Sequence, residues 1–123
     1  MDRTFLWIGA LAAFIGVAFG AFGAHGLRGR LSPESLNVFE TGVRYQMYHA
    51  FAIFVVAIAL TRFGGWSVRA AGWLFTLGII VFSGSLYALA LSGQRWLGAV
   101  TPLGGAAFIA GWIVLAYALW ARP

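Results

Sequence analysis

The sequence contains no cysteine and no lysine, and only three of its 123 residues are acidic. The absence of cysteine excludes disulfides, thiolate metal sites, iron–sulfur clusters and thiol catalysis, and leaves the redox compartment open. Charged residues make up 9% of the chain, against about a quarter in an ordinary soluble domain. Because a small domain must cover a large surface with polar groups, this scarcity of charge excludes a soluble monomer.

Hydrophobic residues are abundant, at 62% of the chain, and 17% of the residues are aromatic. This composition excludes a disordered chain and is typical of an integral membrane protein. The net charge of +5 comes from arginines scattered singly between apolar runs, without the basic stripe of nucleic-acid-binding proteins. We therefore expect the lipid bilayer as the partner and no nucleic acid, with the arginines as anchors at the membrane edges.

The apolar runs are long enough for four membrane spans, because about 20 apolar residues cross the hydrocarbon core. The first run follows Met1-Asp2-Arg3, which also resembles the start of a signal peptide. Its length exceeds the roughly 7–15 apolar residues usual in a signal peptide, so we expect a retained span. The predicted spans cover residues 4–24, 45–61, 68–91 and 101–120.

The second span is preceded by a strong helix start at Ser32-Pro33-Glu34, with an N-cap serine, proline in the first turn and an early acid. A continuous helix from Pro33 to Thr61 would be about 43 Å long, more than the roughly 30 Å hydrocarbon core. Residues 33–43 should therefore lie outside the core as an amphipathic interfacial segment. Its apolar face is formed by Leu36, Phe39 and Val43. Gly42 is the expected position for a bend.

Ser92-Gly93 predicts the end of the third helix, and Thr101-Pro102 predicts that the fourth helix begins at Pro102. Short loops make neighbouring helices antiparallel. The predicted fold class is all-α, a single transmembrane domain over residues 1–123 that forms a four-helix bundle with the interfacial segment before the second span. Both termini then lie on one side, and although the arginines are almost evenly divided between the two sides, we expect cytoplasmic termini.

Small residues recur every four positions on two of the predicted spans. The first span carries Ala12, Gly16, Gly20 and Ala24, and the fourth carries Ala107 and Gly111. Such stripes let helix backbones approach closely, which matters in lipid because the hydrophobic drive between helices is absent. Packing inside the bundle is one interpretation, and contact with a second copy or with another membrane protein is the alternative.

Polar residues at membrane depth are costly, so each is a candidate functional residue. The predicted topology places them near the end of the bundle opposite the termini. The candidate polar cluster or ligand-binding site consists of His25, Tyr45, Gln46, His49, Tyr87 and Thr101. Glu40 and Arg44 have the i,i+4 spacing of a surface ion pair, and His49 is expected to receive a hydrogen bond from Tyr45 or Tyr87.

The chemistry of these residues favours binding or structure over catalysis. Two histidines could ligate a haem or a metal, but a closed metal site needs three or four ligands, and only Glu40 is well placed to join them. Glu40 and His49 are about 13 Å apart along one helix, too far for a direct catalytic pair. Four short helices leave little room for a solute pathway. We therefore predict no catalytic residues, no metal site, no resident cofactor and no enzymatic activity.

Several stretches are more specific than hydropathy requires. They are Gly20-Ala21-Phe22-Gly23-Ala24-His25-Gly26-Leu27, Thr41-Gly42, Tyr45-Gln46, His49-Ala50, Phe82-Ser83-Gly84-Ser85-Leu86-Tyr87, Thr101-Pro102, Gly104-Gly105, Phe108 and Gly111-Trp112. Together they resemble the DUF423 family of small membrane proteins, which includes eukaryotic transmembrane protein 256. The resemblance covers nearly the whole chain. It implies a four-helix protein of an inner or organellar membrane with no accepted catalytic residues, and for this chain we expect the bacterial inner membrane. It also makes a role for the Glu40–Arg44 pair more doubtful.

Two functional hypotheses follow. The first is a non-enzymatic accessory or interaction subunit of the membrane, which the small-residue stripes and the lack of a catalytic set favour. The second is a binding protein for a small ligand, namely a lipid, a quinone, a haem or a metal, with the polar end of the bundle as its mouth. The second hypothesis predicts a cavity between the ends of the first three helices.

Overall fold

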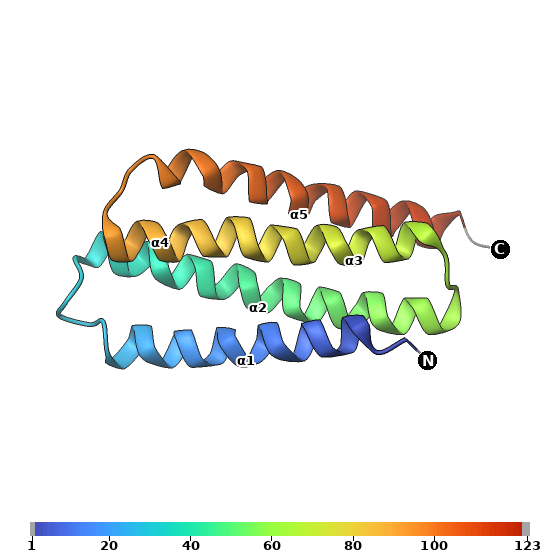
Figure 1. Cartoon of the computed structure of the whole chain (residues 1–123), viewed down its shortest axis with the longest axis horizontal. Helices are drawn as coiled ribbons and strands as arrows, with labels where there is room; N and C mark the ends of the chain where they lie inside the picture. The colour runs from blue at the N-terminus through green and yellow to red at the C-terminus, as the bar shows by residue number, and fades with distance from the viewer. Residues whose placement is uncertain (1, 122–123) are drawn as a thin grey trace.

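The computed structural model describes residues 2–121, and over these residues it is helical without a β-strand (Figure 1). Four helical rods are long and apolar enough to cross a membrane. The third rod contains a π-helical turn, η1, between two α-helical parts. The elements are α1 (Thr4–His25), α2 (Pro33–Arg62), α3 (Trp66–Gly78), η1 (Ile79–Ser83), α4 (Gly84–Ser92) and α5 (Leu97–Trp120). The all-α prediction with four spans is confirmed.

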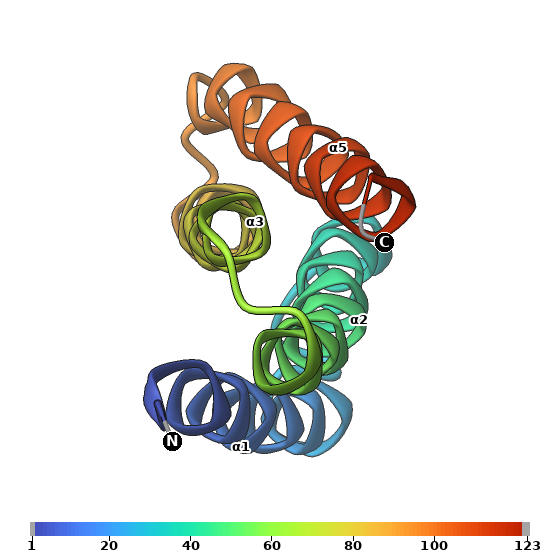
Figure 2. The same ribbon diagram turned by 90° about the vertical axis from the view of Figure 1, so that its right-hand side faces the viewer.

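The helices run up and down, so that α1 begins and α5 ends at the same end of the bundle (Figure 1). The most extensive contacts join α1 to α2 and α3 to α5, and α2 also packs on α3, η1 and α4. Figure 2 shows α1 and α5 on opposite sides, with α2 and the third rod between them. The fold therefore consists of two antiparallel helix pairs that meet through α2 and the third rod.

The helix boundaries follow the local sequence at two of the predicted positions. The hydroxyl of Ser32 accepts a hydrogen bond from the backbone N–H of Ser35 at 3.1 Å, and α2 begins at Pro33. Gly93 ends α4 in the left-handed conformation, with φ of +72°, which a residue without Cβ adopts most easily. α2 continues as one helix through Gly42, so residues 33–43 are the beginning of α2 and not a separate helix, and their interfacial position stays a prediction.

The predicted start of the last helix at Pro102 is wrong, because α5 begins at Leu97. The backbone N–H groups of Leu97, Gly98 and Ala99 donate to the carbonyls of Gln94, Arg95 and Trp96, respectively. These bonds form a helical turn ahead of the proline. The hydroxyl of Thr101 donates to the carbonyl of Leu97 at 3.3 Å, which helps hold the residue before Pro102 in the helical conformation that proline disfavours.

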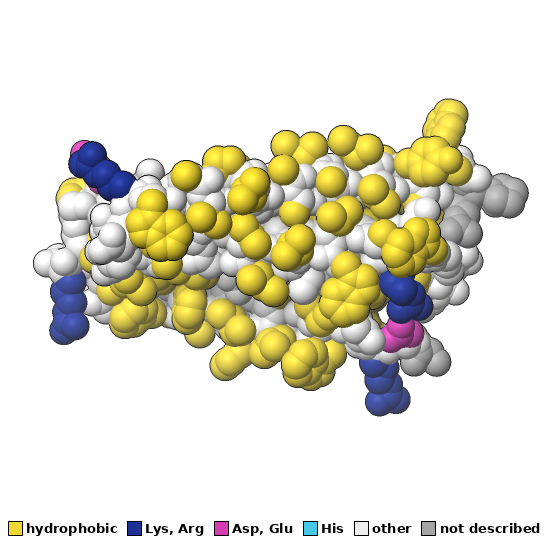
Figure 3. Space-filling view, turned by 45° about the horizontal axis from the view of Figure 1, so that its top comes forward, with side chains coloured by type: hydrophobic (Ala, Val, Ile, Leu, Met, Phe, Trp, Pro, Cys, Tyr) yellow, Lys and Arg dark blue, Asp and Glu magenta, His cyan; other side chains and the backbone are white. Residues whose placement is uncertain are grey.

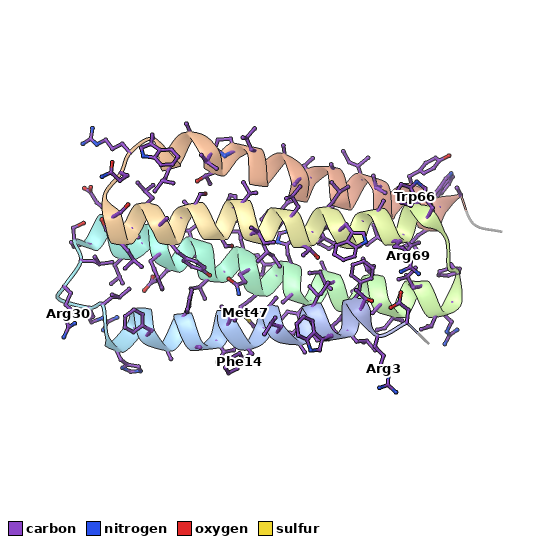
Figure 4. The ribbon with its side chains drawn as sticks, in the orientation of Figure 1. Arg3, Phe14, Arg30, Met47, Trp66 and Arg69 are labelled. Carbon is purple, nitrogen blue, oxygen red and sulfur yellow. The ribbon has the colours of Figure 1, made fainter. Side chains whose placement is uncertain are left out.

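Several glycines allow close helix contacts, two of them by facing an aromatic ring. A Cβ atom at Gly42 would lie 2.7 Å from the ring of Tyr87, and one at Gly111 would lie 2.7 Å from the ring of Phe75. Gly16 of the first small-residue stripe faces Met47 of α2, which Figure 4 labels between the two helices. Gly16 and Gly111 therefore pack inside the chain, as one of the two interpretations of the stripes expects.

The surface is divided into an apolar belt and charged ends. Figure 3 shows hydrophobic side chains along the middle of the molecule and charged side chains at its two ends. Among residues 2–121 the ion pair is the exposed contact of Asp2 with Arg69. The Arg69 guanidinium and the backbone N–H of Thr4 hold the pKa of the Asp2 carboxyl well below its usual range. The predicted Glu40–Arg44 pair is not formed, because Arg44 donates to the hydroxyl of Thr41 at 3.1 Å.

Candidate functional site

The structure brings some of the predicted site residues together and leaves others apart. Gln46, His49 and Tyr87 are buried, with 3%, 5% and 9% of their surfaces exposed. Tyr45 is exposed at 39%, although its ring lies against Phe82 at a centroid distance of 4.9 Å. The remaining two, His25 and Thr101, do not join the buried residues: His25 is exposed at the end of α1, and Thr101 lies near the start of α5.

Gln46 joins three helices. Its Nε2 donates to the backbone carbonyl of Ala12 in α1 at 2.8 Å, and its Oε1 accepts from the hydroxyl of Tyr87 in α4 at 2.7 Å. The Tyr87 ring also meets the ring of Phe19 edge-on, with centroids 5.0 Å apart. Polar groups buried in lipid stabilise a bundle when they find partners on other helices. Gln46 is therefore the polar link between α1, α2 and the third rod.

His49 is fixed on both ring nitrogens. Its Nε2 lies 3.1 Å from the indole nitrogen of Trp112, and its Nδ1 lies 2.7 Å from the backbone carbonyl of Tyr45. Because an indole N–H only donates, Nε2 is the acceptor and Nδ1 carries the hydrogen that is donated to Tyr45. The imidazole also stacks on Phe108, with centroids 3.5 Å apart and planes 7° from parallel. This arrangement describes a neutral imidazole that connects α2 to α5.

Three hydroxyl groups complete the polar contacts. Ser83, at the end of η1, donates to the backbone carbonyl of Gly42 at 2.7 Å. The hydroxyls of Ser85 and Thr101 are 2.6 Å apart and join α4 to α5. Sequence reasoning did not find Trp112 as a partner of His49, and the only signal for it was the Gly111-Trp112 motif. It also did not find the π-helical turn, a feature that often occurs at functional sites.

Gln46 and His49 lie near mid-bundle, whereas Tyr87 lies about 8 Å from the end of α4 at Ser92. Gln46 binds the carbonyl of Ala12, about 12 Å from the start of α1 at Thr4. His49 binds Trp112, well inside α5. Gln46 and His49 lie further from the loops than predicted, because α2 continues for several turns before it comes alongside the middle of α1. Gln46 and His49 are thus deep in the apolar part of the molecule.

The two histidines do not form a common ligand set. Gly9 packs beside the carbonyl of Ala50, the residue after His49. His25 lies sixteen positions further along α1, which corresponds to about 24 Å. Within residues 2–121 there is no group of three or more histidines and acids that could hold a metal ion. The lone pair of His49 is directed at Trp112, so a haem or metal would have to break that hydrogen bond.

Two cavities are described, of which one borders the polar cluster. One, of about 350 Å³, lies at the end of the bundle where the chain begins and is lined by Asp2, Ala57, Leu60, Thr61, Gly64 and Arg69. The other, of about 270 Å³, is a lateral cleft between α1 and the third rod. The lateral cleft is lined by Trp7, Ile8, Leu11, Ala12, Ile15, Gln46, Thr76, Ile79 and Ile80. Of the predicted site residues, Gln46 alone reaches either cavity.

Replacing Trp112 by phenylalanine tests the link between α2 and α5. We expect Trp112→Phe to lower the free energy of unfolding by about 1 kcal/mol, because the buried Nε2 of His49 loses its donor while an aromatic ring remains. Denaturation in mixed micelles, followed by circular dichroism, measures the change. Trp120→Phe is the matched control, since Trp120 is 88% exposed. An equal effect of both substitutions would contradict the structural role of the His49–Trp112 bond.

Comparison with known proteins identifies the family. Residues 19–105 match the family model described as "Protein of unknown function (DUF423)". The chain is 50% identical to the UPF0382 membrane protein YwdK of Bacillus subtilis over 94% of this chain and 95% of the relative. It is 48% identical to a UPF0382 membrane protein of Staphylococcus haemolyticus, with 92% of each chain covered. The UPF0382 membrane protein of Haemophilus influenzae is 42% identical, over 95% of this chain and 94% of the relative.

No solved structure matches the chain. The four apolar helices and the bacterial membrane-protein relatives identify a multi-pass protein of the bacterial inner membrane. The family match covers more than half of the chain and includes the buried polar residues Gln46, His49, Ser83 and Tyr87. The chain therefore belongs to the DUF423 family of membrane proteins.

Proposed function

We propose that this chain is a non-enzymatic accessory or interaction subunit that acts within the plane of the membrane. One observation carries the proposal: each buried side-chain nitrogen or oxygen of residues 2–121 makes at least one hydrogen bond within the chain. A catalytic site needs an acid, base or nucleophile that is free to reach a substrate. Here the buried polar groups hold helices to one another, as expected of a scaffold.

The outer surface supports action inside the bilayer. The connections between the membrane-length helices are short, covering residues 26–32, 63–65 and 93–96. The face of the bundle that Figure 3 shows is apolar along its length. Phe14 of α1 is 70% exposed and points away from the other helices (Figure 4), and Ile113 of α5 is 63% exposed. A partner would therefore meet α1 or α5 sideways, through lipid-facing side chains.

Site-specific crosslinking in living membranes tests this proposal. A phenylalanine analogue bearing a diazirine is placed at Phe14 or at Ile113, and the adducts are separated by mass. We expect a discrete protein adduct, either a second copy or another membrane protein, from at least one of the two positions. The control position is Phe75, which is fully buried and should react only within the chain. Lipid adducts alone at both exposed positions would overturn the interaction role.

Binding of a small ligand is the second candidate function, and the lateral cleft favours it. His25 and His49 lie about 24 Å apart along the bundle, which does not favour a haem or a metal as the ligand. The cleft is apolar except for Gln46 and Thr76, which suits a lipid or a quinone. This candidate does not depend on the accessory role, because a subunit can bind a ligand with or without a protein partner.

A further inference from the structure

The lateral cleft exists because α1 meets the third rod at two separated points. Near the start of α1, the ring of Phe5 packs against Trp73, with centroids 5.2 Å apart. Further along, Phe19 packs against Tyr87, with centroids 5.0 Å apart. Between these aromatic contacts α1 rests on α2, and the space toward α3 and η1 stays open as the 270 Å³ cleft. An aromatic contact thus closes the cleft at each end, Phe5–Trp73 at one and Phe19–Tyr87 at the other.

The walls of the cleft select for a neutral, membrane-soluble molecule. Its lining residues carry no charge. Trp7, Leu11 and Ile80 at its rim are 65%, 40% and 65% exposed, on the part of the surface that faces lipid. A ligand would therefore enter sideways from the bilayer. The volume is just below the roughly 300–1,000 Å³ of small-molecule sites, so the cleft has room for about one substituted ring.

Gln46, one of the residues that line the cleft, carries a hydrogen-bond donor at the end of its side chain. Gln46 is 97% buried, and its Nε2 carries two hydrogens, of which one is donated to the carbonyl of Ala12. Thr76, which also lines the cleft, donates its hydroxyl hydrogen to the carbonyl of Gly72 at 2.8 Å. The second hydrogen of Nε2 is not used in the bond to Ala12, and an N–H hydrogen left without an acceptor in lipid is costly. A ligand oxygen placed against Gln46 would remove that cost.

The depth of Gln46 separates two kinds of ligand. The amide contacts Ala12, about 12 Å along α1 from Thr4 and only about 4 Å from the middle of that helix. Phospholipid ester carbonyls lie at the edge of the roughly 30 Å hydrocarbon core. An acyl chain could fill the cleft but would not bring its ester to Gln46. An oxygen at this depth belongs to a molecule that is wholly soluble in the core.

From this geometry we propose that the lateral cleft binds the head-group ring of a neutral membrane quinone. The second Nε2–H of Gln46 donates to a ring carbonyl oxygen, and the aliphatic side chains of α1 and η1 contact the ring faces. The inference deepens the second candidate function and names its ligand class. It involves no electron transfer and no covalent step.

A binding experiment with two matched pairs of variants tests the inference. The full chain is placed in nanodiscs of phosphatidylcholine, and a decyl-tailed benzoquinone is titrated while tryptophan fluorescence is recorded. Saturable quenching is expected, and Trp7→Phe should remove most of it, because Trp7 lines the cleft. Gln46→Leu should weaken binding about tenfold, the effect of losing one buried hydrogen bond. Gln94→Leu, in the exposed loop before α5, should leave binding unchanged.

The second pair keeps the test valid if Gln46→Leu is poorly folded. Ile80→Phe narrows the cleft without touching the Gln46 hydrogen bonds, and Ile109→Phe is its control, with 64% exposure against 65% for Ile80. Loss of binding in Ile80→Phe alone supports the site. Quenching that is not saturable, or equal in the two isoleucine variants, overturns it. Decane, which is the tail without the quinone ring, serves as a competitor. If decane displaces the quinone as well as the unlabelled quinone does, the cleft binds acyl chains and the quinone assignment fails. The crosslinking test of the accessory role does not depend on this result.

Discussion

Gly104→Ala is expected to lower the free energy of unfolding by about 3 kcal/mol, at the upper end of the cost of overpacking. A Cβ atom at this position would lie 2.6 Å from the Cα of Phe82 and closer still to the backbone nitrogen of Phe82. The neighbour is main chain inside η1, so it cannot turn away as a side chain would. α5 would have to move off the third rod. Titration with sodium dodecyl sulfate in mixed micelles, followed by circular dichroism, measures the loss.

The control for this prediction is the variant Gly105→Ala, at the residue that follows Gly104. A Cβ atom at Gly105 would lie 3.8 Å from the ring of Phe82, an ordinary van der Waals contact. Alanine is also favoured over glycine in a helix by about 1 kcal/mol. Gly105→Ala should therefore leave the bundle as stable as before or slightly more stable. If the two alanine variants unfold at the same detergent fraction, the close approach of α5 to η1 is not what stabilises this contact.

Gln46→Leu is expected to lower the free energy of unfolding by about 2 kcal/mol. The substitution leaves the buried hydroxyl of Tyr87 without its acceptor, and a buried polar group without a partner costs about 1–3 kcal/mol. The carbonyl of Ala12 loses a second donor, which costs less because it can keep its helical bond. Interhelical hydrogen bonds in membrane proteins contribute at most about 1.7 kcal/mol each. The same micelle titration measures the effect, with Gln94→Leu as the neutral control.

The double variant Gln46→Leu/Tyr87→Phe distinguishes a hydrogen-bond network from simple packing. Tyr87→Phe alone should cost about 1 kcal/mol, since it leaves Gln46 Oε1 without its donor. When both partners are removed, no unsatisfied group remains between them. The double variant should therefore be no less stable than Gln46→Leu alone. Strictly additive losses would show that the two side chains contribute independently, against the role of Gln46 as a link between helices.

Much of the fold could be predicted from the sequence because apolar length and helix-end signals are local. The start of α2 at Ser32-Pro33 and the end of α4 at Gly93 depend on residues within a few positions. The start of α5 could not be predicted in this way. Pro102 resembles a helix start, and only the turn formed by Gln94 to Trp96 together with the contacts of Thr101 extends the helix before it.

The candidate site was predictable in its residue types but not in its partners. The uncharged polar residues of α2 stood out because they interrupt an apolar run. Their partners are a backbone carbonyl at Ala12 and an indole at Trp112, and neither is marked in the sequence as a hydrogen-bonding group for a distant residue. Nothing in the sequence around Gly104 likewise indicates that this residue faces the main chain of Phe82. Contacts between helices depend on how each helix is rotated about its axis and how far it is shifted along that axis. The order of residues in the sequence does not give either quantity.

The π-helical turn at Ile79–Ser83 has a consequence for how the length of this chain can vary. A turn closed by i→i+5 hydrogen bonds contains one residue more than an α-helical turn of the same rod. Removing one residue there would restore a regular α-helix and keep α3 and α4 facing the same neighbours. A deletion elsewhere in a long helix would rotate all following residues by about 100°. The third rod therefore holds a position where one residue can be lost without changing which side chains face the rest of the bundle.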